Sequence, residues 1–303
     1  MVAVSSSVIV LSRRLGPVLP ASALPVLRAA SAVYADDSVP DSLAVAAGAQ
    51  RLTGSLPAGA VLLTCEGTPT APEPAGAALL DAVAVMDRLR SPGGCPWDAE
   101  QTHESLLQYL VEETYELYQA IEDGERADIR EELGDVLLQV LFHARVAAED
   151  PAGDGAPFTI DDVAADLVAK LVGRHPHVFA GTERIDTAVA QEGRWEELKR
   201  AEKQRGSAVD GVPLGQPAVA LAAKLVSRTA RAGLPADLLP TGDDVGARLF
   251  REIAAAKRAG EEPESALRTT AREFADTVRA AEKAAGTDPH ALTGEAWRAA
   301  WPS

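Results

Sequence analysis

Two pairs of acidic residues are spaced so that each pair would lie on one face of a helix, where its carboxylates could act together. They lie in the runs E-E-T-Y-E at residues 112–116 and E-E-L-G-D at residues 131–135. Residues three apart in a helix have Cβ atoms about 5–6 Å apart on one face. The segment between the runs is long enough to end one helix, turn and begin an antiparallel partner. Four carboxylates are therefore expected to face one another across a helical hairpin. They belong to Glu113, Glu116, Glu132 and Asp135.

Four carboxylates in one pocket repel one another unless cations neutralise them. Ligands that are all oxygen favour a hard ion, Mg²⁺ with Mn²⁺ as a substitute, over zinc. A magnesium ion held by carboxylates keeps positions open for water and for phosphate oxygens. The residue types thus predict metal-assisted attack of water on a phosphoanhydride.

The simpler interpretation is that these acids belong to solvated helix faces of a very acidic protein. Two features argue against it. No basic residue stands four positions after Glu112, Glu113 or Glu116, where an exposed helix would gain an ion pair. Apolar residues also flank the acids closely, which places the acids near the edge of a buried stripe. The flanking residues are Leu110, Val111, Leu117, Leu133 and Val136.

Hydrophobic periodicity predicts the helices that position these acids. The breaks between them are S-P-G-G at residues 91–94, Gly124 and Asp150-Pro151, and Thr159 or Asp161 offers a cap for a fourth helix. The predicted helices cover residues 79–89, 105–121 and 127–148, and the fourth runs from either cap to about Arg174.

The rest of the chain divides where the pattern changes. Residues 1–75 predict a small α/β appendage that ends in a proline-rich linker at residues 67–74. Residues 76–206 form the acidic helical domain, and residues 207–303 predict further helices with breaks at glycine and proline. Within the appendage, strands are predicted at residues 8–11, 32–34 and 61–64, and a helix at residues 22–32.

Bulk composition argues against several classes of function. The formal net charge is −16 and no Lys/Arg block is present, so nucleic-acid binding is not expected. No apolar run is long enough for a membrane span, so no membrane partner is expected. Cys65 and Cys95 lack a zinc-site spacing and fit a reducing compartment. Prolines interrupt the stretch after Arg13 and Arg14, which disfavours a twin-arginine export signal, and we expect a cytoplasmic protein.

Several motifs besides the acids resemble the MazG family of all-α nucleoside triphosphate pyrophosphohydrolases. The E-x-x-E…E-x-x-D pattern is the one that this family shares with all-α dUTPases. The resemblance covers residues 79–204. It is carried by S-P-G-G-C-P-W-D at residues 91–98, by the run from Glu131 through Gln139 to His143, by R-H-P-H-V-F at residues 174–179 and by W-E-E-L-K at residues 195–199.

The resemblance implies a mainly α fold, an all-α nucleoside triphosphate pyrophosphatase bundle with a small N-terminal α/β appendage and a degenerate second helical domain. It implies that the four acids hold Mg²⁺, and that nucleoside triphosphates are cleaved to monophosphate and pyrophosphate. A homodimer or higher homo-oligomer is expected. Lys170, Arg174 and Trp195 stand where family members contact the nucleotide, although a solvated helix face would also explain the two cations. Glu112 is the candidate general base for the water that attacks the α-phosphorus.

Residues 207–303 resemble a second MazG domain in degraded form. The run at residues 243–247 parallels E-E-L-G-D but has Ala247 in place of the final Asp, and residues 234–241 offer no first acidic helix. Glu273 stands near the place of a phosphate-contacting lysine. We therefore expect this domain to be inactive and to serve dimerisation or support. The first 75 residues resemble the start of tetrapyrrole methylases but lack their glycine-rich loop, so no methyltransferase activity is expected.

Other reactive residue types are expected to be structural. Cys95 precedes Pro96 and is expected to pack in a turn, and Trp97 is expected to be a packing anchor. The histidines lack the arrangement of a zinc site and are expected to form structural hydrogen bonds. They are His103, His143, His175 and His177.

Three other functions stay open at this point. One is a narrower pyrophosphatase for dUTP, dCTP or a damaged nucleotide, since helix spacing does not encode base preference. Another is a helical protein that senses nucleotide without turning it over. A third is a purely structural acidic bundle that binds neither metal nor nucleotide. Steady turnover with magnesium separates the enzymes from the other two.

Overall fold

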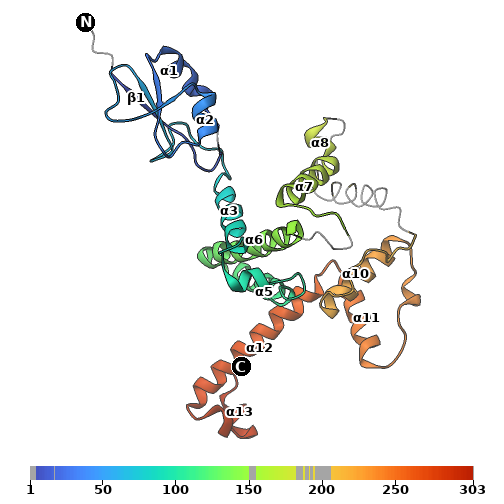
Figure 1. The fold of residues 1–303 in the computed structure, drawn as a ribbon. Helices are drawn as coiled ribbons and strands as arrows, with labels where there is room; N and C mark the ends of the chain where they lie inside the picture. The colour runs from blue at the N-terminus through green and yellow to red at the C-terminus, as the bar shows by residue number, and fades with distance from the viewer. Residues whose placement is uncertain are drawn as a thin grey trace. The chain divides into compact units, whose positions relative to one another are not determined.

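A computed structural model describes residues 5–16, 18–149, 155–181 and 206–302, together with Thr187, Gln191 and Arg194. The chain splits into two compact units, Met1–Thr182 and Glu183–Ser303. Most of the described elements in both units are helices (Figure 1), which confirms the mainly α fold class. Among the described residues, no helix is both long and apolar enough to cross a bilayer.

Unit 1 begins with a small parallel sheet of four strands in the order β1-β4-β2-β3. The register places Ile9 beside Leu63 and Leu63 beside Ala35. These three side chains are at most 3% exposed and form a row across the centre of the sheet. Short helices pack on this core, because Leu27 and Leu43 contact it. The elements are β1 (Ser7–Val10), the 3₁₀ helix η1 (Ala21–Ala23), α1 (Leu24–Ala29), β2 (Val33–Ala35), α2 (Asp41–Ala46), β3 (Gln50–Arg51) and β4 (Val61–Thr64).

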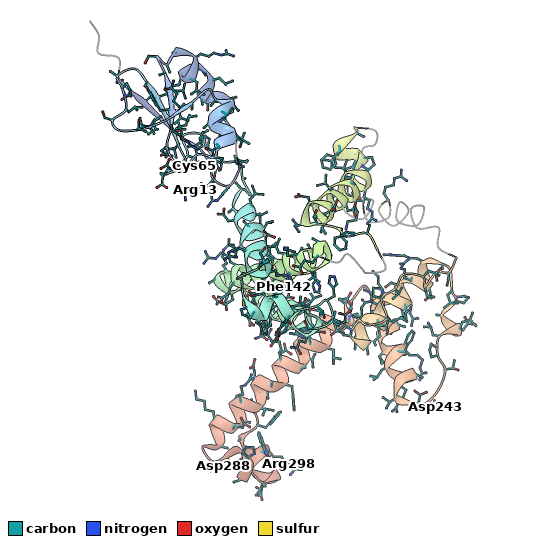
Figure 2. The ribbon with its side chains drawn as sticks, in the orientation of Figure 1. Arg13, Cys65, Phe142, Asp243, Asp288 and Arg298 are labelled. Carbon is teal, nitrogen blue, oxygen red and sulfur yellow. The ribbon has the colours of Figure 1, made fainter. Side chains whose placement is uncertain are left out.

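Arg13 and Arg14 hold the chain after β1 against the chain after β4. Arg13 donates through Nε to the carbonyl of Cys65 at 2.9 Å, and Figure 2 labels both residues. Arg14 pairs with Glu73 of the proline-rich segment at 2.5 Å and with Asp81 of the first long helix at 2.6 Å. Both arginines are therefore part of the folded structure, and Arg14 connects the proline-rich segment and the first long helix to the chain that follows β1.

The helical part of unit 1 is built around the longest helical hairpin of the chain. Its core is made by Met86, Leu106, Leu141 and Phe142. Gly124 ends the first helix of the hairpin with φ of 77°, a conformation that favours glycine, and lets the chain turn back at once. The elements are α3 (Ala78–Arg90), α4 (Pro96–Glu100), α5 (Leu107–Asp123), α6 (Arg126–Glu149), α7 (Ile160–Arg174) and α8 (Pro176–Phe179).

The turn between α3 and α4 requires glycine. Gly93 has φ of 78°. At Gly94, an added Cβ would lie 2.1 Å from the carbonyl oxygen of Leu89. That oxygen accepts the Cys95 N–H at 2.8 Å, so the close approach is part of how the turn is held.

We expect Gly94→Ala to destabilise this turn by about 2 kcal/mol or more, because the clash is with backbone and cannot be relieved by a rotamer change. Hydrogen exchange of the 86–100 segment should accelerate. Gly134→Ala is the matched control, since Gly134 lies inside α6 with nothing within 4 Å of its added Cβ. It should raise stability by about 0.5–1 kcal/mol. If the amides of residues 86–100 exchanged equally slowly in the two variants, the role of Gly94 in the turn would be contradicted.

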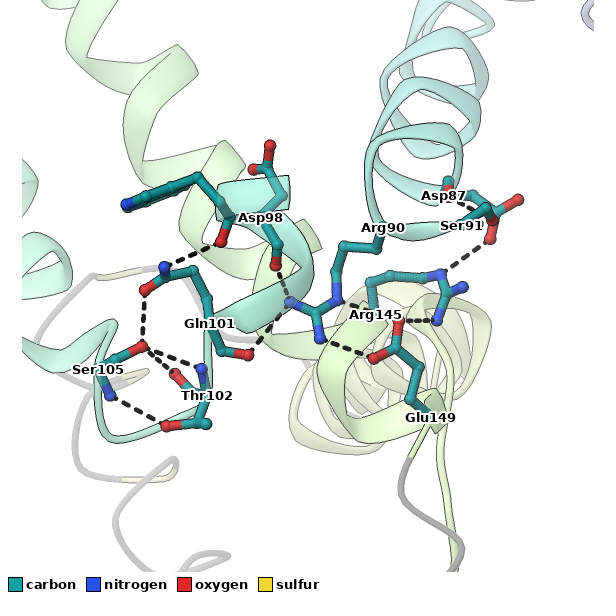
Figure 3. Close-up of polar contacts among 10 residues, drawn as sticks. Asp87, Arg90, Ser91, Asp98, Gln101, Thr102, Ser105, Arg145 and Glu149 are labelled. Atoms are coloured by element: carbon teal, nitrogen blue, oxygen red, sulfur yellow. Dashed lines mark hydrogen bonds and ion pairs between the residues drawn. The ribbon is translucent and has the colours of Figure 1, made fainter. Parts of the chain in front are cut away.

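Arg90 ties the end of α3 to α4 and to α6 (Figure 3). Its side chain is only 5% exposed and forms two bonds to Glu149, at 3.0 Å through Nε and 2.7 Å through Nη2. Its Nη1 donates to the carbonyls of Asp98 and Gln101. The hydrogen bond from Arg90 holds the pKa of the Glu149 carboxyl below its ordinary value. Arg90 therefore stabilises the 91–101 segment against the hairpin.

Replacing Arg90 with alanine should lower the free energy of unfolding of this helical part by about 2–3 kcal/mol. It removes several charge-assisted bonds, although Glu149 keeps its pair with Arg145 at 2.6 Å. Urea denaturation with hydrogen exchange of residues 91–101 measures the change. Arg88→Ala, which removes an exposed side chain with only two long carbonyl bonds, is the control and should change stability by less than about 1 kcal/mol. A loss at Arg88 as large as that at Arg90 would contradict this assignment.

Unit 2 is an Ala-rich helical assembly, as expected of a chain that is 4% aromatic. Ala254, in the helix at residues 245–258, and Ala281, in the helix at residues 263–285, are fully buried, which allows close helix contacts. Asp244 caps the second long helix by accepting the Ala247 N–H at 3.0 Å. The elements are α10 (Ala218–Arg231), the 3₁₀ helix η2 (Ala236–Leu238), α11 (Val245–Arg258), α12 (Pro263–Ala285), the 3₁₀ helix η3 (Pro289–Ala291) and α13 (Gly294–Ala300).

Candidate active site

The four acids lie on the two helices of one hairpin. Glu113 and Glu116 belong to α5, and Glu132 and Asp135 belong to α6. The helices lie side by side in Figure 1 and contact each other along the hairpin. The short turn at Gly124 makes them antiparallel, so positions equally far from the turn face each other. The two helices and the turn between them are those that the apolar spacing predicted.

Three of the carboxylates already form a compact group. Ligand oxygens of Glu113, Glu116 and Glu132 all lie within 4.8 Å of one another. Asp135 is not part of this tight group, yet its charge acts on both Glu113 and Glu132. Within the described residues, no second group of three or more potential metal ligands lies this close together.

The pKa values of two of these acids are raised, because the acids are partly buried and lie close together. Burial raises the pKa of Glu113, and the charges of Asp135, Glu116, Glu132 and Glu112 raise it further. Burial likewise raises the pKa of Glu132, followed by the charges of Glu116 and Asp135. Both shifts mean that the ionised form is disfavoured while no cation is present.

Glu132 supplies the clearest sign that a cation fits here. Its Oε2 is shut off from solvent, and it has no hydrogen-bond partner within the described part of the chain. A buried carboxylate oxygen without a donor is costly, and a metal ion would satisfy it. The donor set is oxygen only, which suits a hard divalent ion such as Mg²⁺. The residues present therefore fit a divalent cation.

The structure describes only two of the three residues that are expected to contact the nucleotide. Lys170 and Arg174 lie four residues apart on α7, with Lys170 exposed and Arg174 buried. A cation beside the acids would lower their pKa values, and neither Lys170 nor Arg174 is among the largest causes acting on Glu113 and Glu132. Trp195 lies outside the described residues.

Glu112 is exposed on α5, beside the acidic group, and its charge acts on Glu113. Two further acids were missed by the sequence reasoning. Glu131 and Asp128 of α6 also raise the pKa of Glu132. Their signal was present in the sequence, because Asp128 stands four residues before Glu132 on the same helix and Glu131 directly precedes it.

The histidines and Trp97 have structural contacts. His103 and His143 stack with ring centroids 5.1 Å apart and Nδ1 atoms 2.8 Å apart. Burial, followed by the charge of His103, lowers the pKa of His143. His175 closes the α7–α8 turn, with its Nδ1 at 2.6 Å from the Leu171 carbonyl. Trp97 makes edge contacts with Tyr109 and Phe142, as a packing anchor does.

Comparisons with known proteins cover the same segments. Residues 101–179 match the MazG nucleotide pyrophosphohydrolase domain, and residues 6–85 match the MazG N-terminal domain. A nucleoside triphosphate pyrophosphohydrolase of Mycolicibacterium smegmatis is 47% identical over 251 residues, which are 77% of this chain and 72% of that one. The chain belongs to the MazG family. The resemblance seen in the motifs is thereby confirmed.

Two further relatives agree with this membership. A nucleoside triphosphate pyrophosphohydrolase of Mycobacterium tuberculosis is 44% identical over 75% of this chain and 70% of its own length. A nucleoside triphosphate pyrophosphohydrolase/pyrophosphatase MazG of Thermotoga maritima is 35% identical over 69% of this chain and 87% of its own. The segment that matches the MazG domain contains all four acids together with Lys170 and Arg174, whereas Trp195 follows it.

The run in unit 2 that parallels E-E-L-G-D has a different role from its MazG counterpart. Asp244 caps α11, and Ala247 is 8% exposed within the helix. A carboxylate committed to a helix N-terminus and a buried alanine do not make a pair of metal ligands. This local structure supports our expectation that residues 207–303 carry no second catalytic site.

Proposed function

We propose that this chain hydrolyses nucleoside triphosphates to nucleoside monophosphates and pyrophosphate, with Mg²⁺ held by Glu113, Glu116, Glu132 and Asp135. The observation that carries the proposal is the convergence of three carboxylates within 4.8 Å, with the Glu132 Oε2 buried and unpartnered. Membership of the MazG family supports the reaction, because the relatives are named for it.

The acids perform two tasks in this proposal. Fixed on the rigid hairpin, they hold a cation-binding geometry without paying for its assembly during the reaction. Bound Mg²⁺ would supply charge neutralisation for the triphosphate and would lower the pKa of a coordinated water. Glu112, which is exposed beside the group, is the residue proposed to accept the proton of the attacking water.

The residues on the substrate side are proposed from the resemblance to the family, and their charge and side-chain type are compatible with it. Lys170 and Arg174 are the cations proposed to meet phosphate oxygens, and Trp195 is proposed to cover the sugar or base. We also propose that the complete pocket is formed in a homodimer. Apolar side chains beside the acids remain uncovered in the isolated chain, which supports an interface there. They include Val111, Ile121 and Leu133, each more than half exposed.

The test of the reaction is release of pyrophosphate from a panel of canonical and damaged nucleoside triphosphates, measured with Mg²⁺, with Mn²⁺ and with EDTA. We expect metal-dependent formation of monophosphate and pyrophosphate in equal amounts, and the order of rates supplies the base preference. Formation of diphosphate and inorganic phosphate would place attack at another phosphorus and contradict the proposal. Metal-dependent binding without turnover would assign the chain to nucleotide sensing.

We also propose that the protein works in the cytoplasm as a dimer. Cys65 and Cys95 are both unpaired, which fits a reducing compartment, and a nucleotide substrate is present there. Light scattering with size separation measures the dimer directly. Leu133→Asp should shift the equilibrium from dimer toward monomer, because the substitution puts a charge into the uncovered apolar face.

A further inference from the structure

A pocket of about 320 Å³ in unit 2 collects positive charge in a chain whose acids outnumber its bases. The pocket lies along α10 and takes one cation from the end of α11. Its floor is made by the small residues Ala220 and Ala223. Its charged lining residues are Lys224, Arg228, Arg231, Lys257 and Glu262.

The three cations of α10 share one face of that helix. Lys224, Arg228 and Arg231 are four and three residues apart, and α10 contains no acidic residue. Like charges at these spacings cost about 0.2–0.5 kcal/mol each in a helix. The helix dipole favours Arg228 and Arg231 in the last turn, but Lys224 stands near the middle of α10 and gains nothing from it.

The two acidic side chains nearest the pocket already have partners. Glu262, the acid that lines it, pairs with the lining residue Lys257 through Nζ at 2.9 Å. Glu264 accepts the N–H of Ala220 at 3.1 Å. Within the described part of the chain, Lys224 makes no ion pair, and Arg228 has one long bond of 3.5 Å to the Asp210 carbonyl. The positive charges of Lys224 and Arg228 are therefore largely uncompensated.

We propose that this pocket binds a diphosphate group without a metal ion. Its volume lies at the small end of the range for ligand pockets, about 300–1,000 Å³, which suits a diphosphate better than a whole nucleotide. Several convergent cations match the charge of a diphosphate, and the guanidinium of Arg228 offers paired N–H donors to its oxygens. The group comes either from inorganic pyrophosphate or from the phosphate end of a nucleotide. This site is independent of the acidic hairpin, which needs a metal to hold the same anion.

The experiment uses one difference between the two sites: the acidic hairpin needs a metal ion to bind a diphosphate, and the α10 pocket does not. Binding of inorganic pyrophosphate to the full chain is measured by calorimetry in EDTA, where the acidic hairpin repels it. We expect saturable binding that weakens as salt is added. The double variant Lys224→Gln/Arg228→Gln should weaken the affinity about 10-fold or more, because two charge-assisted contacts are lost.

Three controls make the result decisive. Arg248→Gln/Lys283→Gln removes the same charge from exposed positions of unit 2 outside the pocket and should leave the affinity unchanged. Glu113→Gln/Glu132→Gln should also leave it unchanged, so the outcome does not depend on hydrolysis. Lys224→Ala alone should weaken binding if the double variant loses its fold by circular dichroism.

A nucleoside triphosphate with an α,β-methylene bridge separates the two sources of the group. Affinity equal to that of pyrophosphate shows that the diphosphate alone is recognised, whereas tighter binding that the same double variant weakens assigns the pocket to the nucleotide. Absence of saturable binding in EDTA would overturn the proposal. So would binding that the α10 variant leaves intact, or binding that disappears with the hairpin acids.

Discussion

Glu132→Gln is expected to remove hydrolysis while making the metal-free protein more stable. Glutamine keeps the shape of the side chain but removes a charge that four neighbouring acids repel. Loss of a metal ligand should lower kcat/KM by at least about 100-fold. In EDTA the melting temperature should rise, since burial and neighbouring charges disfavour the ionised Glu132. Activity and stability would thus move in opposite directions, as at sites built for function.

Glu100→Gln is the matched control, because it removes a glutamate charge from the exposed end of α4. It should change neither kcat/KM nor the melting temperature. Asp135→Ala should abolish activity as Glu132→Gln does, with the fold retained by circular dichroism. An active Glu132→Gln enzyme would refute the assignment of the hairpin as the metal site.

Magnesium is expected to stabilise the chain increasingly as the pH rises. The folded-state pKa values of Glu113 and Glu132 lie above the ordinary value of 4.5. The folded state therefore holds these protons more tightly than the unfolded state does. Their contribution to stability is fully present below about pH 4.5 and is lost as the pH rises through the raised values. Magnesium binds the ionised carboxylates and competes with these protons. The stabilisation that magnesium gives therefore increases as the pH rises.

The measurement is the melting temperature across this pH range, with EDTA and with Mg²⁺, for the wild type and for Glu113→Gln/Glu132→Gln. Subtracting the variant removes the contributions of carboxyls elsewhere, such as Glu149, whose pKa is lowered. With free Mg²⁺ at a hundred times Kd, the wild type should gain about 2.7 kcal/mol. A gain of the same size in the variant would show that the ion binds elsewhere.

The sequence predicted the helical hairpin because every local signal there agreed. Apolar positions recur at helical spacing on both helices, and Gly124 stands where the first must end. Thr159 and Asp161 were both open as caps, and the structure selects Thr159, whose hydroxyl group accepts the Asp162 N–H. The mainly α fold followed from these same patterns.

The N-terminal sheet was less completely predicted. The strands near residues 8, 33 and 61 are confirmed. The helix predicted over residues 22–32 is shorter and starts as a 3₁₀ turn, because β2 must begin at Val33. Helix α2 and strand β3 were missed, since a six-residue helix and a two-residue strand carry too few positions for a periodic signal.

The candidate site shows where sequence reasoning stops. Helical spacing places acids on a shared face, and it predicted the convergence of Glu113, Glu116 and Glu132. It does not fix rotamers, so it does not predict that the Asp135 carboxylate lies outside the tight group. Nor does it place Lys170 and Arg174 relative to the acids, because that depends on packing between distant segments.

The compact hairpin has a consequence for the order in which this protein folds. All four acids come from one short stretch of chain, whereas the sheet pairs Ser7 with Val61, far away in sequence. Contacts between near neighbours close small loops and form quickly, and pairing of distant parallel strands is slow. The acidic hairpin should therefore be assembled before the sheet is complete. A complete chain that refolds would form its charged cluster early, and magnesium bound at that moment would speed folding as well as stabilise the folded state.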